Sequence, residues 1–194
     1  MIWTVPNILT LLRIILIPVL VLVFFFPSPW SYQLSAAVFG VAALTDWLDG
    51  YLARRLGQLS LFGAFLDPVA DKLMVAVALV LLVQDNPSFM YAIPAAIIIG
   101  REIAISALRE WMAELGERTK VAVSIVGKIK TTTQMVAILL LLYKVPLGPL
   151  PTHAVGTILL YIAALLTLWS MVVYLRAAWP ILSGNSGSRP GEGA

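Results

Sequence analysis

The chain has 194 residues, of which 60% are hydrophobic and only 12% are charged. An ordinary soluble domain carries about 25% charged residues, so this composition excludes a typical water-soluble globule. The net charge is +3, and the Lys and Arg residues form no dense basic run, so we expect no nucleic-acid partner. Because the sequence has no cysteine, it can form neither disulfides nor thiolate metal sites.

Hydropathy predicts six membrane-spanning helices. Such a helix needs roughly 20 apolar residues to cross a ~30 Å hydrocarbon core, so this length leaves room for one membrane domain and little else. The expected spans are residues 7–26, 32–54, 62–84, 89–114, 121–143 and 154–175. The predicted class is an all-α integral membrane protein, with one membrane-embedded domain over residues 1–182 and a small, polar, disordered tail over residues 183–194.

Charge and proline predict the orientation of these spans. The first, third and fifth connections contain proline and should lie on one side of the membrane, and Lys144 is the only basic residue among them. The second and fourth connections hold the other flanking basic residues, which are Arg54, Arg55, Arg118 and Lys120. By the positive-inside rule both termini are therefore cytoplasmic. Asp85, in the third connection, is expected to be a solvated loop residue.

Four aspartates stand out because charged side chains are rare inside membrane spans. An ionised side chain at mid-bilayer costs roughly 2.5 to 3.5 kcal/mol, so such residues are functional candidates. Asp46 and Asp49 are three apart near the end of the second expected span, and Asp67 and Asp71 are four apart near the start of the third. Each pair therefore shares one helical face. Because a short connection joins the two spans, the four carboxylates can face one another.

Four like charges in a partly dry site repel unless cations compensate them. Carboxylate oxygens suit Mg²⁺ or Mn²⁺, and two such ions ~3.5 to 4 Å apart stabilise the attacking and leaving oxygens of phosphoryl transfer. The aspartates thus indicate a divalent-metal site that binds a diphosphate. The alternative is that they lie at the membrane interface and reach water or pair with Arg54, Arg55 and Lys72.

Small residues accompany the aspartates. Gly50, Ala53 and Gly63 each lie four residues from one of them and so share their helical faces. The absence of side-chain bulk would let a nucleotide or diphosphate approach the backbone, and Arg54 would add a fixed cation for phosphate oxygens.

This pattern resembles the signature of the CDP-alcohol phosphotransferase family. It reads Asp46-x-x-Asp49-Gly50-x-x-Ala53-Arg54, then eight residues, Gly63, three residues, Asp67, three residues and Asp71, with all eight fixed positions present. The resemblance continues in residues 6–13, 63–72, 101–116 and 121–131 and covers nearly the whole chain up to the tail. It is closest to the bacterial members that use sn-glycerol 3-phosphate.

The resemblance implies a six-helix homodimer in the bacterial cytoplasmic (inner) membrane, with its active site near the cytoplasmic face. It implies transfer of the phosphatidyl group of CDP-diacylglycerol to sn-glycerol 3-phosphate, with release of CMP. The acceptor hydroxyl would attack the β-phosphorus, assisted by two divalent cations per subunit, Mg²⁺ or Mn²⁺. The carried-over metal ligands are Asp46, Asp49, Asp67 and Asp71.

The resemblance also implies roles for single residues. Asp71 would be the general base, or would mainly orient the acceptor hydroxyl. The residues expected to bind CDP-diacylglycerol are Gly50, Ala53, Arg54 and Gly63, together with Asn7 and Thr10, which form a stripe with Arg13 on the first span. Helix capping is an equally good account of Asn7.

A second set of charges is expected to bind the acceptor, because the phosphate of glycerol 3-phosphate needs cationic partners. The candidates are Arg101 and Arg109 in the fourth expected span and Lys128 and Lys130 in the fifth. The alternative is an ion-paired stripe that merely stabilises the bundle, since Glu102 and Arg109 lie seven residues apart on one helical face.

Two other functions remain open, and a third is disfavoured. The donor chemistry could serve another acceptor, such as inositol phosphate, serine or phosphatidylglycerol, since the eight-position motif belongs to the donor half. A cation or proton-coupled transporter could use the intramembrane acids as a relay, although the acids cluster at one edge and no inverted repeat is visible. A membrane prenyltransferase would need two separated Asp-rich segments, which this chain lacks. His153, far from the aspartates, is expected to have no catalytic role.

Overall fold

The computed structural model of the protein describes residues 5–56, 61–114 and 125–182. These ranges form the six helices α1 Val5–Phe25, α2 Ser31–Leu56, α3 Leu61–Asp85, α4 Phe89–Glu114, α5 Ile125–Tyr143 and α6 Thr152–Leu182. No β-strand occurs in these ranges, and only an isolated bridge joins Leu147 to Leu150. The six expected helical segments and the all-α class are confirmed. The expected start of the fifth segment at residue 121 and the tail over residues 183–194 lie outside the described residues.

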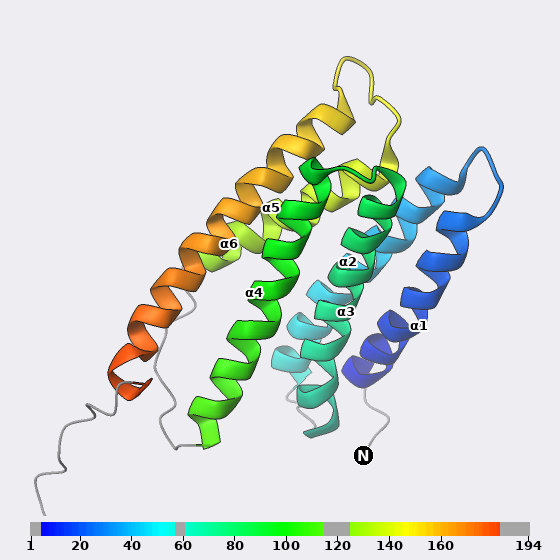
Figure 1. The fold of residues 1–194 in the computed structure, drawn as a ribbon. Helices are drawn as coiled ribbons and strands as arrows, with labels where there is room; N and C mark the ends of the chain where they lie inside the picture. The colour runs from blue at the N-terminus through cyan, green and yellow to red at the C-terminus, as the bar shows by residue number, and fades with distance from the viewer. Residues whose placement is uncertain (1–4, 57–60, 115–124, 183–194) are drawn as a thin grey trace, which may run out of the picture.

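Successive helices run in opposite directions, as Figure 1 shows. The connections over residues 26–30, 86–88 and 144–151 all lie at the upper end of the view, and α1 begins at the lower end. Proline occurs in each of these connections and has no N–H to continue a helical hydrogen-bond ladder. The three proline-bearing connections therefore lie at one end of the bundle, and their place on one side of the membrane stays a prediction.

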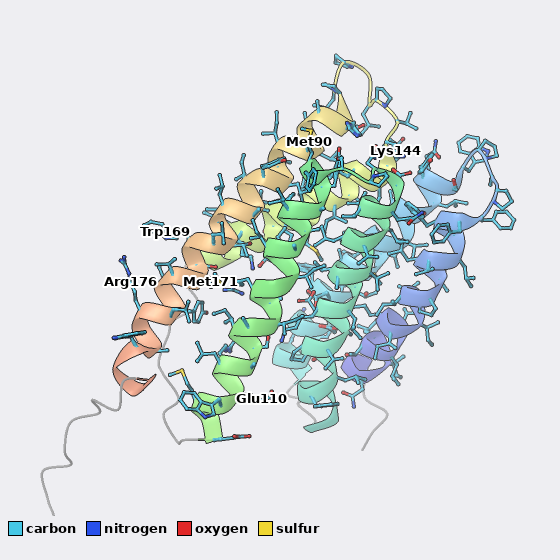
Figure 2. The ribbon with its side chains drawn as sticks, viewed as in Figure 1. Met90, Glu110, Lys144, Trp169, Met171 and Arg176 are labelled. Atoms are coloured by element: carbon cyan, nitrogen blue, oxygen red, sulfur yellow. The ribbon has the colours of Figure 1, made fainter. Side chains whose placement is uncertain are left out.

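Within the residues that the structure describes, three helices are long and apolar enough to cross a membrane. These stretches are Asn7–Phe25 in α1, Phe89–Glu114 in α4 and Thr152–Arg176 in α6. In α2 and α3 polar and charged residues interrupt the apolar sequence, and the apolar part of α5, Ile129–Tyr143, is shorter. Large apolar side chains such as Leu22, Leu165 and Trp169 lie exposed, and Trp169 points away from the bundle in Figure 2. This exterior is suited to lipid.

The bundle is held together by two closely packed groups of helices. Helix α1 packs along α2 and α3, whereas α5 packs along α6 and α2, and α4 packs along α6. Phe39 and Ile138 are among the fully buried core residues. Gly156 lets α6 approach α5 closely, since a Cβ atom there would lie 2.9 Å from Leu141 Cγ. Contact between α3 and α4 is less extensive, which leaves room for a groove between them.

Lys144 ties three helices together at the upper end of the bundle. It follows α5 in the left-handed backbone region, with φ +58°. Its Nζ forms an ion pair with Asp85 and lies 4.1 Å from the centroid of the Tyr32 ring in α2. The expectation that Asp85 is a solvated loop residue is therefore wrong, because it ends α3 and its side chain is 12% exposed. Local sequence did not indicate this pairing, because Lys144 belongs to a different connection.

Candidate active site

A buried arginine of α1 lies between the first two aspartates. Arg13 is 1% exposed, and its Nη1 lies 2.8 Å from Asp46 Oδ1. Its Nη2 donates a hydrogen bond to Asp49 Oδ2, and the Asp49 side chain is 6% exposed whereas that of Asp46 is 42% exposed. In the described part of the chain Arg13 Nε is buried without a hydrogen-bond partner. One guanidinium thus compensates two carboxylates at the last turns of α2.

The same face of α1 reaches the third aspartate. Thr10 is fully buried and donates a hydrogen bond from its hydroxyl to Asp67 Oδ1 in α3. Asn7 is also buried, and as the third residue of α1 it lies within the first turn rather than at the N-cap position. The spacing of three residues between Asn7, Thr10 and Arg13 keeps them on one helical face. Helix α1 therefore contributes a polar stripe to both acidic pairs.

Asp71 and Lys72 connect this acidic region to α4. Asp71 lies within electrostatic range of Asp46, Arg13 and Lys72. The Lys72 ammonium donates a hydrogen bond to Ser106 Oγ, and that hydroxyl donates to the backbone carbonyl of Glu102 at 2.5 Å. Two consecutive residues of α3 thus contact two different parts of the site.

Glu102 is the centre of an ion-pair network between α4, α5 and α6. Lys130 Nζ lies 2.5 Å from Glu102 Oε1, and Arg101 Nη1 lies 3.1 Å from the same oxygen. The Arg101 guanidinium also lies 5.3 Å from the centroid of the Tyr174 ring in α6. These ion pairs fit the structural alternative of an ion-paired stripe, although the Glu102 carboxylate is directed toward Lys130 of the neighbouring helix.

A groove between α3 and α4 lies beside the acidic region. It has a volume of about 460 Å³, and its polar lining residues are Lys72, Ser106, Arg109 and Glu110. Glu110 lies at the end of the bundle opposite Lys144 (Figure 2), so the groove opens near the end where α2 meets α3. The groove therefore offers the cations of Lys72 and Arg109, together with the carboxylate of Glu110, to a ligand.

Several sequence-predicted residues are placed only by their helix. Gly50, Ala53 and Arg54 lie in the last two turns of α2, and Lys128 lies in the first turn of α5, but their side chains fall outside the described part of the structure. Gly63 is buried in the first turn of α3.

The sequence interpretation did not assign functional roles to Arg13, Lys72, Ser106 or Glu102. Each of these side chains forms a contact between two helices. A charged residue inside an apolar span was the available signal for Arg13 and Glu102, whereas Ser106 offered none.

The chemistry of the four aspartates fits a divalent cation, although they are not gathered around one point. Among the residues that the structure describes, no three Asp, Glu or His side chains are close enough to hold a metal ion together. However, Asp46 and Asp49 already converge on a cationic group, the guanidinium of Arg13. Their oxygen donors are those that Mg²⁺ and Mn²⁺ prefer.

Comparison with known proteins identifies a family and close relatives. The family described as CDP-alcohol phosphatidyltransferase matches residues 3–169. A protein of Salmonella choleraesuis (strain SC-B67), named CDP-diacylglycerol--glycerol-3-phosphate 3-phosphatidyltransferase, is 54% identical over 91% of this chain and 95% of its own. Proteins with the same name are 56% identical in Shigella flexneri serotype 5b (strain 8401), over 91% of this chain and 95% of their own, and in Pseudomonas fluorescens, over 92% and 91%.

Proposed function

Since the chain belongs to the CDP-alcohol phosphatidyltransferase family, we propose that it transfers the phosphatidyl group of CDP-diacylglycerol to sn-glycerol 3-phosphate. The products are phosphatidylglycerol phosphate and CMP. The relatives named for this reaction match nine-tenths of the chain, and this supports the choice of acceptor. The observation that carries the proposal is the position of Asp71 and Lys72, which connect an acidic site to a basic groove.

The acidic site would receive the donor. Asp46, Asp49, Asp67 and Asp71 would hold two divalent cations per subunit, Mg²⁺ or Mn²⁺, and members of this family generally use divalent metal ions. Bound there, the ions would neutralise the diphosphate and the charge that develops on the oxygen leaving with CMP.

The residues around the acidic site would bind the nucleotide and the diphosphate. Gly50, Ala53 and Gly63 would leave room for the nucleotide, and Arg54 would contact the phosphates. Asn7 and Thr10 would hold donor or carboxylate oxygens from the buried face of α1, in keeping with the contact between Thr10 and Asp67.

The groove would receive the acceptor. Arg109 and Lys72 would bind the phosphate of glycerol 3-phosphate at the groove wall, and Lys128 remains a further candidate. Asp71 would take the proton of the attacking hydroxyl or orient that hydroxyl toward the β-phosphorus. Arg101 and Lys130 carry one positive charge in excess of Glu102, which would raise the potential of the acceptor region.

The same proposal includes the cellular arrangement. We propose that all six helices cross the bacterial inner membrane, with both termini and the active site toward the cytoplasm, and that two copies form a homodimer. Residues 1–182 would form the single membrane domain and residues 183–194 a disordered tail. The shared end of the three proline-bearing connections supports this orientation, because Lys144 is the only basic residue there.

Release of CMP from CDP-diacylglycerol by the purified protein tests the proposal. Glycerol 3-phosphate, inositol phosphate and serine are supplied separately, with Mg²⁺ or with a chelator. We expect release with glycerol 3-phosphate alone, lost with the chelator. Release only with another alcohol would move the protein to a different acceptor, and no release with any alcohol would contradict the transferase and favour the transporter.

A further inference from the structure

The proposed reaction gives no role to the buried guanidinium of Arg13. It lies against Asp46 and Asp49, two of the four residues proposed as metal ligands. A charge with 1% exposure is costly inside a membrane domain unless it is paired, and here one cation is paired with two anions. Without Arg13 the two carboxylates would lose this shared cation while they lie beside each other on one face of α2.

The two contacts of Arg13 differ in kind. The contact with Asp49 is a hydrogen bond between two buried groups, whereas Nη1 approaches Asp46 at 2.8 Å without hydrogen-bond geometry. Asp46 is also the more exposed partner. The pairing with Asp46 is therefore the weaker one and the one that an ion arriving from water reaches first.

A divalent cation needs the same oxygens that Arg13 now contacts. Its short ligand distances, about 2.0 to 2.1 Å for Mg²⁺, leave no space for a guanidinium between the same two carboxylates. We propose that Arg13 is a resident cation that compensates Asp46 and Asp49 in the metal-free protein and competes with divalent cations for them. This inference depends on the metal site of the proposed function.

Competition predicts opposite effects of removing Arg13 on folding and on metal binding. Without the guanidinium the metal-free site loses the cation that its two carboxylates share, so the apoprotein should unfold at a lower temperature. The same excess of negative charge should bind a divalent cation more tightly, and the cation should restore much of the lost stability.

The experiment compares Arg13→Gln with the wild type and with Arg176→Gln, which removes an exposed arginine of α6. Mn²⁺ binding is measured by electron paramagnetic resonance of the free ion, and thermal unfolding is measured with chelator or with Mg²⁺. We expect Arg13→Gln to bind Mn²⁺ about tenfold more tightly than the wild type. We also expect Mg²⁺ to raise the melting temperature of this variant more than that of the wild type. Arg176→Gln should behave as the wild type does.

Arg13→Lys supplies an intermediate case, because a single ammonium cannot contact both carboxylates as a planar guanidinium does. We expect its Mn²⁺ affinity to lie between those of the wild type and Arg13→Gln. Equal or weaker Mn²⁺ binding by Arg13→Gln would overturn the inference, and so would failure of this variant to fold in Mg²⁺ as well as in chelator.

The readout separates this inference from the proposed function. Tighter Mn²⁺ binding by Arg13→Gln in a protein that releases no CMP would uphold the competition and reject the transferase. Metal-dependent CMP release by the wild type, with unchanged Mn²⁺ affinity in Arg13→Gln, would do the reverse.

Discussion

At the scale of single residues, the site depends on the neighbouring positions Asp71 and Lys72. Successive residues of an α-helix point about 100° apart, so one turn of α3 can serve two ligands. Asp71 lies in the field of Asp46 and Arg13, whereas Lys72 contacts Ser106 in the groove wall. The reacting groups of donor and acceptor could therefore meet at one point on a rigid helix.

Asp71→Asn should abolish most of the activity. An amide is nearly isosteric with the carboxylate but can neither accept the hydroxyl proton nor supply a charge for a cation, so kcat for CMP release should fall at least about a hundredfold. Asp85→Asn is the matched control, because it changes the same residue type at the other end of α3. Similar losses in both variants would mean that damage to the fold, rather than the chemistry, explains the effect.

Lys72→Gln should weaken acceptor binding. Loss of a charged contact to phosphate is worth about 1.5 to 3 kcal/mol, so the KM for glycerol 3-phosphate should rise about tenfold or more. The KM for CDP-diacylglycerol should change much less. Steady-state kinetics with each substrate varied in turn measures both values, and Arg176→Gln is the control for removing a cation elsewhere. An unchanged KM for glycerol 3-phosphate would exclude Lys72 from the acceptor site.

The sequence predicted the aspartates but not their partners. Spacing along a helix shows which residues share a face. It therefore predicted that Asp46 and Asp49 lie on one face, and likewise Asp67 and Asp71. Spacing does not show which helices pack together. The contact of Lys72 with Ser106 spans 34 residues and that of Arg13 with Asp49 spans 36, so both required the fold.

At the scale of helices, hydropathy located all six segments, and the last helix continues beyond its expected membrane span. The fourth expected segment, residues 89–114, coincides with α4, whose start follows a proline. The sixth expected span, residues 154–175, agrees with the apolar stretch Thr152–Arg176, and the helix itself continues to Leu182. Hydropathy measures the preference for lipid, whereas an arginine does not interrupt backbone hydrogen bonds and can extend to the interface.

Gly156→Ala should destabilise the packing of α6 on α5. The added methyl group would meet Leu141 Cγ at 2.9 Å and Leu140 Cβ at 3.2 Å, so the free energy of unfolding should fall by about 1 to 3 kcal/mol. Gly100→Ala is the control, because a Cβ atom there meets no described atom within 4 Å. Replacing that helical glycine should raise stability by about 0.5 to 1 kcal/mol. Equilibrium unfolding in detergent measures both, and equal effects would contradict the close approach.

At the scale of the whole molecule, the two ends of the bundle differ in chemistry. One end holds the aspartates, Arg13 and the groove, whereas the other holds the Lys144 ion pair and the contact of Tyr91 with His153, whose atoms lie 3.0 Å apart. The placement of His153 away from the aspartates agrees with expectation. Because successive helices alternate in direction, every second connection lies at the same end of the bundle. Residues far apart in the sequence therefore meet at each end.

Labelling of single cysteines tests the orientation, because the natural chain has no cysteine to interfere. We expect Ser88→Cys to react with a membrane-impermeant maleimide in intact cells and Arg118→Cys to react only after the membrane is permeabilised. Both variants should be labelled equally in permeabilised cells. Labelling of Arg118→Cys in intact cells would reverse the proposed topology.

The burial of Arg13 has a consequence for how the protein is made. During synthesis α1 emerges first, whereas Asp46 and Asp49 follow more than thirty residues later. Until they arrive, α1 carries a lone charge that disfavours its transfer into lipid by roughly 2.5 to 3.5 kcal/mol at mid-bilayer. We expect α1 and α2 to leave the insertion machinery together as a helical hairpin, with the ion pair already formed. The cation that lies between Asp46 and Asp49 in the folded bundle would then also determine how α1 enters the membrane.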